Sequence, residues 1–146
     1  MSGLHTQLGA LAISVNALAA LLGGFAWLAR RPLRAFWFAL RAGQVLIMLE
    51  AVVGAALLLD GHDLPRLHLV YGLMPIAVAF VAEQLRLTAT PTLLDQRGLE
   101  GGADVAKLPQ AEQRALVAAI IRREIAVMAT SAAVVAVLAA RAQGWL

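Results

Sequence analysis

The stretch LGALAISVNALAALLGGFAWL, residues 8–28, carries no charged side chain and is followed directly by Arg30 and Arg31. Three further apolar stretches have similar lengths, at residues 36–59, 67–87 and 120–140. A bilayer core of roughly 30 Å is crossed by about 20 helical residues, because a helix rises 1.5 Å per residue. Only helices and closed barrels satisfy their backbone groups inside a bilayer, and these segments are too long for barrel strands. The sequence therefore predicts an all-α integral membrane protein, a four-helix bundle with up-down-up-down connections.

The composition agrees with a membrane protein of one domain. The chain is 61% hydrophobic and 14% charged, and four crossings occupy most of residues 1–146. Its basic residues, which give a formal net charge of +3, flank apolar segments and form no stripe with interleaved aromatics. We therefore expect no nucleic-acid partner. The chain has no cysteine, which excludes disulfides, thiolate nucleophiles and cysteine-ligated metals.

The basic residues also predict the orientation, because Lys and Arg collect on the cytoplasmic side of membrane helices. Arg66 and Arg141 fall on one side of the predicted bundle. The other ten lie around the first and third connections: Arg30, Arg31, Arg34, Arg41, Arg86, Arg97, Lys107, Arg114, Arg122 and Arg123. We predict a multi-pass protein of the plasma (inner) membrane, with both termini outside and the connection 88–119 in the cytoplasm. The first segment lacks a basic region before it, so we expect it to be retained rather than cleaved as a signal peptide.

The long connection 88–119 has its own pattern. Thr90 and Pro91 are typical of a helix start, and Gly98 is typical of a stop. Residues 100–107 resemble a mobile loop, and Pro109 then opens a helix that nothing interrupts before Ala140. At about 30 residues, or roughly 45 Å, this last helix should extend into the cytoplasm before it enters lipid.

Several polar residues are predicted to share one depth in the membrane. Counted inward from the outer ends of antiparallel helices, this depth is about 12–14 Å. The layer consists of Glu50, Asn16, Thr130 and Ser131, together with Pro75, which frees the carbonyl of Tyr71. A central charge costs about 2.5–3.5 kcal/mol on insertion scales, so Glu50 needs a physical reason. Three interpretations stay open: a polar tie between helices, a titrating carboxyl at a transport site, or contact with a partner subunit.

A second polar group is predicted at the inner membrane edge. Arg41 on the second helix matches the depth of Glu83 and Arg86 on the third. We interpret these residues as an ion-pair network between helices, with Arg41–Glu83 as its main pair. If the membrane site conducts, the same network is an inner gate.

The histidines support two competing hypotheses. His68 and Tyr71 either pass protons inward or anchor the helix at the interface. His68 and His5 lie at similar depth, so an alternative is axial ligation of haem b, or quinone binding, in an electron-transfer subunit. His62 and Asp63 add to the outer connection, but their spacing matches no compact metal motif, so we expect no metal site.

The pattern favours a non-enzymatic protein, because no serine, histidine and acid recur at a plausible catalytic site. The leading hypothesis is proton or small-cation binding or transport through the layer centred on Glu50. The alternatives are the haem or quinone subunit that uses His68 and an accessory or assembly subunit of a larger membrane complex. The chain lacks the repeated halves of large transporters, so in the bilayer we expect a homo-oligomer or a partner membrane subunit. The smooth alanine face of the last helix, at Ala129, Ala132, Ala133 and Ala136, offers a surface for such association.

Overall fold

The computed structural model describes residues 2–61 and 65–146, and every regular element in that part is a helix. The helices are α1 (Ser2–Ala29), α2 (Arg34–Leu59), α3 (Arg66–Leu87), α4 (Ala89–Asp95), α5 (Gly102–Lys107) and α6 (Gln110–Ala142). Four of them, α1, α2, α3 and α6, are long and apolar enough to cross a membrane. The prediction of four helices long and apolar enough to span a membrane is therefore confirmed.

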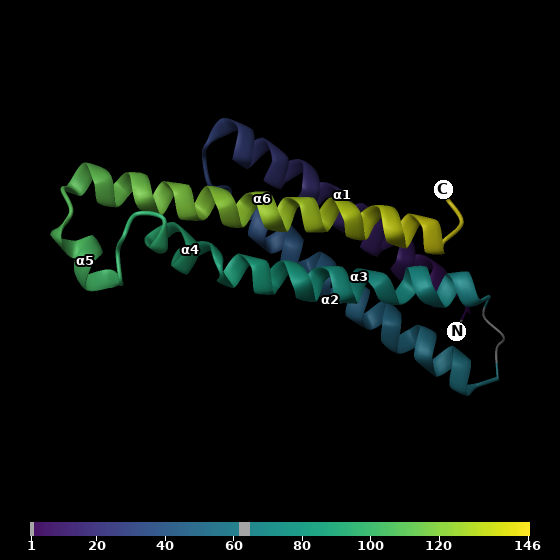
Figure 1. The fold of residues 1–146 in the computed structure, drawn as a ribbon. Coiled ribbons are helices and arrows are strands. Elements are labelled where there is room, and N and C mark those ends of the chain that lie inside the picture. Colours follow the sequence, from purple (N-terminus) through teal and green to yellow (C-terminus); the bar gives the residue numbers. More distant parts are fainter. Residues whose placement is uncertain (1, 62–64) are drawn as a thin grey trace.

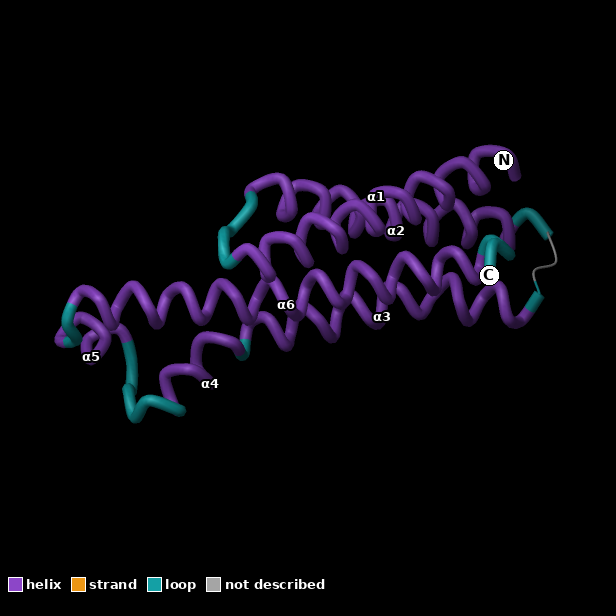
Figure 2. The backbone as a smooth tube through the Cα atoms, turned by 90° about the horizontal axis from the view of Figure 1, so that it is seen from above, coloured by secondary structure: helices purple, strands orange, loops and turns teal. Residues whose placement is uncertain are grey.

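The four long helices form two layers. Figure 2 shows α1 beside α2 in one layer and α6 beside α3 in the other. Helix α6 packs extensively on both α1 and α3, and α1 packs on α2, whereas α2 and α3 touch each other far less. Both chain ends lie at one end of the bundle, here called the terminal end (Figure 1). The α1–α2 connection, α4 and α5 lie toward the opposite end, here called the arginine-rich end.

The contact between α1 and α6 is made of small residues. Ala12, Ala19 and Ala26 on α1 recur every seven residues and are fully buried. They belong to two apolar clusters in which α6 contributes small side chains, among them Ala129, Ala132 and Ala139. Small residues at this spacing let two helix backbones approach closely.

The alanine face of α6 differs from its expected role. Ala129, Ala132 and Ala136 are buried inside the bundle, and of the four alanines proposed for association Ala133 alone is exposed. The face is therefore occupied by the chain's own helices. The sequence pattern predicts a smooth alanine surface on α6, but it does not predict which helix packs against that surface.

Gly23 marks the tightest part of the contact between α1, α2 and α6. A Cβ atom at Gly23 would lie 2.6 Å from the Cβ of Ala129 and 2.6 Å from a ring carbon of Phe36. The next residue, Gly24, has nothing within 4 Å of the same position. The lack of a side chain is therefore a packing requirement at Gly23 and not at Gly24.

The connection between α3 and α6 contains more helix than expected. Residues 102–107 form α5, where a mobile loop was predicted. Asp104 organises this turn, because its carboxylate accepts hydrogen bonds from Lys107 Nζ at 2.8 Å and from the backbone N–H of Glu100 at 3.1 Å. These two donors, Lys107 first, lower the pKa of Asp104 below its ordinary value. Helix α6 runs past the end of α1 toward α5, as its length predicted (Figure 1).

Candidate functional site

At the terminal end, four helices bring together two histidines, a carboxyl group and an amide. His5 Nδ1 on α1 lies 3.1 Å from Glu50 Oε1 on α2. His5 Nε2 lies 3.4 Å from His68 Nε2 on α3, with the two rings edge to face. Gln143, at the end of α6, donates from its Nε2 to Glu50 Oε1 at 3.4 Å. We call His5, Glu50, His68 and Gln143 the His–Glu cluster.

Glycines set the register that brings the cluster together. A Cβ atom at Gly9 on α1 would lie 2.9 Å from Glu50 Oε1, and one at Gly54 on α2 would lie 3.4 Å from the His5 ring. His5 precedes Gly9 by four residues, and Glu50 precedes Gly54 by four, so each pair shares a helix face. Each glycine on one helix therefore leaves room for a polar side chain of the other.

The cluster is mostly withdrawn from the surface and is not fully hydrogen-bonded. The side chains of His5 and Glu50 are 15% and 17% exposed. His5 Nδ1 and Glu50 Oε2 are buried atoms without a hydrogen-bond partner in the described part of the chain. His5 Nδ1 and Glu50 Oε1 thus lie within ion-pair distance, but their geometry is not that of a hydrogen bond. His68 differs, because its Nδ1 lies 2.9 Å from the carbonyl oxygen of Ala142.

Two small cavities lie one after the other along the bundle. The first, about 250 Å³, is lined by the His–Glu cluster and by apolar side chains of all four long helices. The second, about 270 Å³, is lined by Asn16 and Ser131 and, nearer the arginine-rich end, by Glu83. Both cavities touch Ile47 and Pro75, which form the boundary between them.

The structure does not assemble the polar layer predicted around Glu50. Asn16 lies beside Gly43, and its amide donates to the Ala12 carbonyl at 2.8 Å. The residue opposite Glu50 on α1 is Gly9, seven positions before Asn16, or about 10 Å along the helix. The physical reason is that α1 begins at Ser2 rather than at residue 8, so a depth counted from the apolar stretch is displaced.

The other predicted members of that layer are also apart from Glu50. Ser131 is buried and lines the second cavity with Asn16. Thr130 is exposed on the surface of α6. Tyr71 is half-buried, and the Arg141 guanidinium lies 5.9 Å from the centre of its ring.

The polar network at the far end of α2 and α3 is assembled. Arg41 pairs with Glu83 Oε1, and Arg86 Nε lies 2.9 Å from Glu83 Oε2. Gln44 Nε2 donates to Glu83 Oε1 at 3.0 Å, and Arg86 extends the network to Glu124 on α6 at 3.8 Å. One carboxylate therefore holds two guanidinium groups and an amide from two helices, a charge-assisted arrangement.

The His5–His68 pair brings together the two histidines of the haem hypothesis, which stays a prediction. Two axial imidazoles would face each other across the iron, about 4 Å apart at metal–nitrogen bonds of about 2.0 Å, and here the two Nε2 atoms lie 3.4 Å apart. The first cavity, about 250 Å³, is smaller than the roughly 300–1,000 Å³ of pockets for drug-sized ligands. Residues 2–61 and 65–146 contain no group of three or more His, Asp or Glu that could hold a metal. His62 and Asp63, considered above as ligands, lie outside the described residues.

Sequence reasoning missed Gln143 and the His5–Glu50 contact. The four-residue spacings of His5 with Gly9 and of Glu50 with Gly54 were the available signal. Comparison with protein-family models, with curated proteins and with solved structures gives no match to this chain.

Proposed function

We propose that this chain is a non-enzymatic membrane protein that binds a proton at the His–Glu cluster and passes it along the bundle. The observation that carries the proposal is the order of polar atoms from the Ala142 carbonyl through His68 and His5 to Glu50. Each contact in this series constrains the position of the hydrogen in the next one.

The series begins at a group that only accepts. Because the Ala142 carbonyl has no hydrogen, His68 Nδ1 is the donor in their 2.9 Å contact. A neutral His68 then has a lone pair on Nε2, so His5 Nε2 donates to it. A neutral His5 is left with a lone pair on Nδ1, which faces Glu50 Oε1 at 3.1 Å. Lone pairs on both atoms would repel, so either His5 Nδ1 or the Glu50 carboxyl carries a proton.

That shared proton has two positions with the same net charge. It sits on the carboxyl of Glu50 with His5 neutral, or on His5 with Glu50 ionised. From a charged His5, the hydrogen on Nε2 can pass to Nε2 of His68, which leads toward the terminal end. The donor set also favours a proton over sodium or calcium, because hard cations prefer oxygen ligands and this cluster offers several nitrogens.

The two cavities support a route with a closed barrier. Beyond Ile47 and Pro75, the next titratable group along the cavities is Glu83, which is held by Arg41 and Arg86. An apolar boundary between these two cavities blocks water until the helices move. The limited packing between α2 and α3 supports such movement at this side of the bundle. In this proposal, the Glu83 network is the inner gate.

We also propose the orientation: an up-down-up-down bundle in the plasma (inner) membrane with the terminal end outside. The support is the concentration of arginines at the other end. Because the chain has no cysteine, single-cysteine variants at Gly98 and Trp145 report each side directly. A membrane-impermeant maleimide should label position 145 and not position 98 in intact cells. The reverse pattern would invert the proposed orientation.

Proton flux into liposomes tests the function. The full chain is reconstituted with an internal pH-sensitive dye, and a potassium gradient with valinomycin provides the driving potential. The wild type should acidify the lumen faster than protein-free liposomes. Glu50→Gln should abolish the difference, because an amide cannot share the proton with His5. Glu100→Gln, which removes an exposed acid in the α4–α5 connection, is the matched control. Wild-type flux in Glu50→Gln would refute the proposal, as would a wild type without flux.

A further inference from the structure

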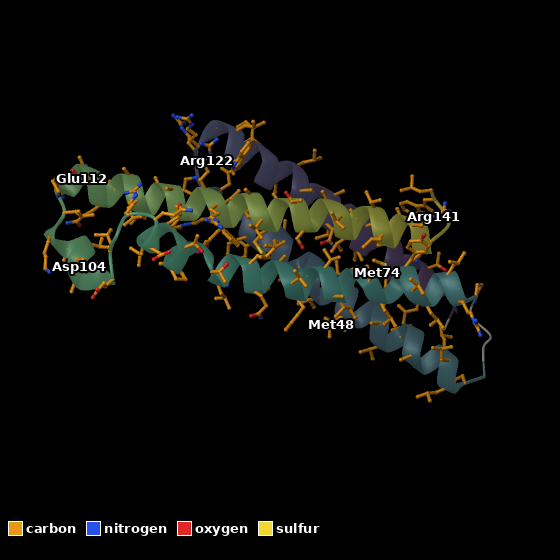
Figure 3. All side chains as sticks on the ribbon, viewed as in Figure 1. Met48, Met74, Asp104, Glu112, Arg122 and Arg141 are labelled. Carbon is orange, nitrogen blue, oxygen red and sulfur yellow. The ribbon has the colours of Figure 1, made fainter. Side chains whose placement is uncertain are left out.

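A cavity larger than the two described above lies away from the His–Glu cluster, at the arginine-rich end. Its volume is about 650 Å³, and it is bounded by the end of α1, the α1–α2 connection and the first half of α6. Four arginines line it: Arg30 and Arg31 from the connection, and Arg114 and Arg122 from α6. We call it the arginine cavity. Figure 3 shows Arg122 beside the α1–α2 connection, far from Arg141 at the terminal end.

The positive charge of the arginine cavity is not balanced within the described chain. No acidic side chain lines the cavity. The ion pairs found among residues 2–61 and 65–146 use His5, Arg41, Arg86 and Lys107, and none of the four cavity arginines. Clustered cations repel one another, so their convergence on one cavity favours an anionic ligand.

Arg122 adds a second, independent sign of a missing partner. Its Nε is a buried donor without a hydrogen-bond acceptor in the described chain. Its guanidinium lies 4.9 Å from the centre of the Trp27 ring, which fixes the position of the group by a cation–π contact. A buried guanidinium donor that lacks an acceptor is costly. A phosphate oxygen in the cavity would supply that acceptor, because arginine donors match phosphate geometry.

The cavity wall is polar along the first turns of α6, and deeper in the bundle Arg122 lies among apolar side chains. Gln110, Gln113 and Arg114 belong to the first turns of α6, whereas Ile121 and Ile125 lie deeper in the bundle. Arg114 and Ile125 are separated by about 16 Å along the helix. A small soluble phosphate would use only the cationic part. A ligand with a charged head and a hydrocarbon chain would use the whole wall.

We infer that the arginine cavity binds the phosphate head group of an anionic phospholipid, with the upper part of an acyl chain against Ile121 and Ile125. Basic pockets beside membrane helices recognise such head groups by charge and hydrogen bonding. The site shares no residue with the His–Glu cluster. It therefore stands or falls independently of the proposed proton function.

Native mass spectrometry of the full chain in a neutral detergent tests the inference. Phosphatidylglycerol is titrated against phosphatidylcholine with the same acyl chains, and the bound fraction of each is measured. The wild type should bind phosphatidylglycerol at least tenfold more tightly. Equal binding of the two lipids would overturn the inference, and this comparison does not depend on the folding of any variant.

A matched pair of variants then locates the site. Arg31→Gln with Arg114→Gln removes two cavity arginines and leaves Arg122 stacked on Trp27. Each arginine near anionic lipid contributes about fivefold, so phosphatidylglycerol binding should weaken about 25-fold. Arg97→Gln with Arg123→Gln removes the same charge from exposed positions that do not line the cavity, and binding should change less than threefold. An equal loss in both double variants would overturn the inference, because net charge alone would explain it.

Glycerol 3-phosphate distinguishes lipid from a soluble phosphate compound. It carries the same phosphate chemistry without acyl chains. At millimolar concentration it should leave phosphatidylglycerol bound, because the apolar wall contributes to lipid affinity. Complete displacement would overturn the lipid assignment and identify the cavity as a soluble-phosphate site.

Discussion

Adjacent glycines on α1 allow one packing contact to be measured against its own control. In Gly23→Ala, the new Cβ would lie 2.6 Å from the Cβ of Ala129 and from a ring carbon of Phe36. Carbon atoms normally pack at about 3.5–4.0 Å, so α1 must move by roughly 1 Å from both neighbours. Overpacking of this kind costs about 1–3 kcal/mol. Alanine itself favours the helix over glycine by about 0.5–1 kcal/mol, which offsets part of that cost.

Gly24→Ala carries the same backbone gain without the contact, because nothing lies within 4 Å of its Cβ position. The difference between the two variants should therefore equal the overpacking term, about 1–3 kcal/mol. Reversible unfolding in mixed micelles with rising dodecyl sulfate, followed by circular dichroism, measures both free energies. Adding Ala129→Gly to Gly23→Ala should recover part of the loss, since the Phe36 contact remains. If Gly23→Ala is as stable as Gly24→Ala, the described packing of α1 against α2 and α6 is wrong.

Three further outcomes are expected. Gly9→Ala should change the free energy of unfolding by less than about 1 kcal/mol, because the new Cβ meets the flexible end of Gln143. The same variant should shift the infrared carboxyl band of Glu50. An unchanged band would contradict the close approach of Gly9 to that carboxyl. Glu83→Gln should lower the free energy of unfolding by about 1.5–3 kcal/mol in the same assay, because it removes the carboxylate that accepts charged hydrogen bonds from Arg41 and Arg86. A loss below about 0.5 kcal/mol would show that the network adds little to stability. Because the pKa of Asp104 is lowered in the folded chain, its contribution to α5 is complete above the ordinary value of 3.8 and is lost as pH falls through the folded value. The amide resonance of Glu100 should follow this titration with a midpoint below 3.8, and a midpoint above 3.8 would remove the assigned role of Asp104.

The four spans and the Glu83 network were predictable because they depend on strong local signals. A run of about twenty apolar residues predicts a membrane crossing. Arg41 on α2 and Glu83 on α3 were predicted to lie at nearly equal depth, and they form an ion pair. The contact of His5 with His68 also agrees with the depth estimate. In these cases a count along one helix is sufficient.

The composition of the Glu50 site was not predictable by counting alone. Residues 2–7 are polar enough to resemble a tail, yet they continue α1 and carry His5 into the bundle. The partner of Glu50 depends on the register between two helices, which is set by where a glycine admits a side chain. Helix α5 was missed for a related reason, because glycines 101 and 102 indicate a loop while Asp104 supplies the hydrogen bonds of a turn.

The alanine stripe of α1 has a consequence for how the chain is made. Its partner α6 leaves the ribosome roughly 80 residues after α2, a delay of about 4–16 s at 5–20 residues per second. During that interval Ala12, Ala19 and Ala26 lack the α6 side chains that later cover them. Small apolar groups tolerate that wait, since hydrocarbon solvates them about as well as a protein interior does. The α1–α2 hairpin can therefore stay inserted during translation, and α6 can pack against it later without first breaking a non-native polar contact.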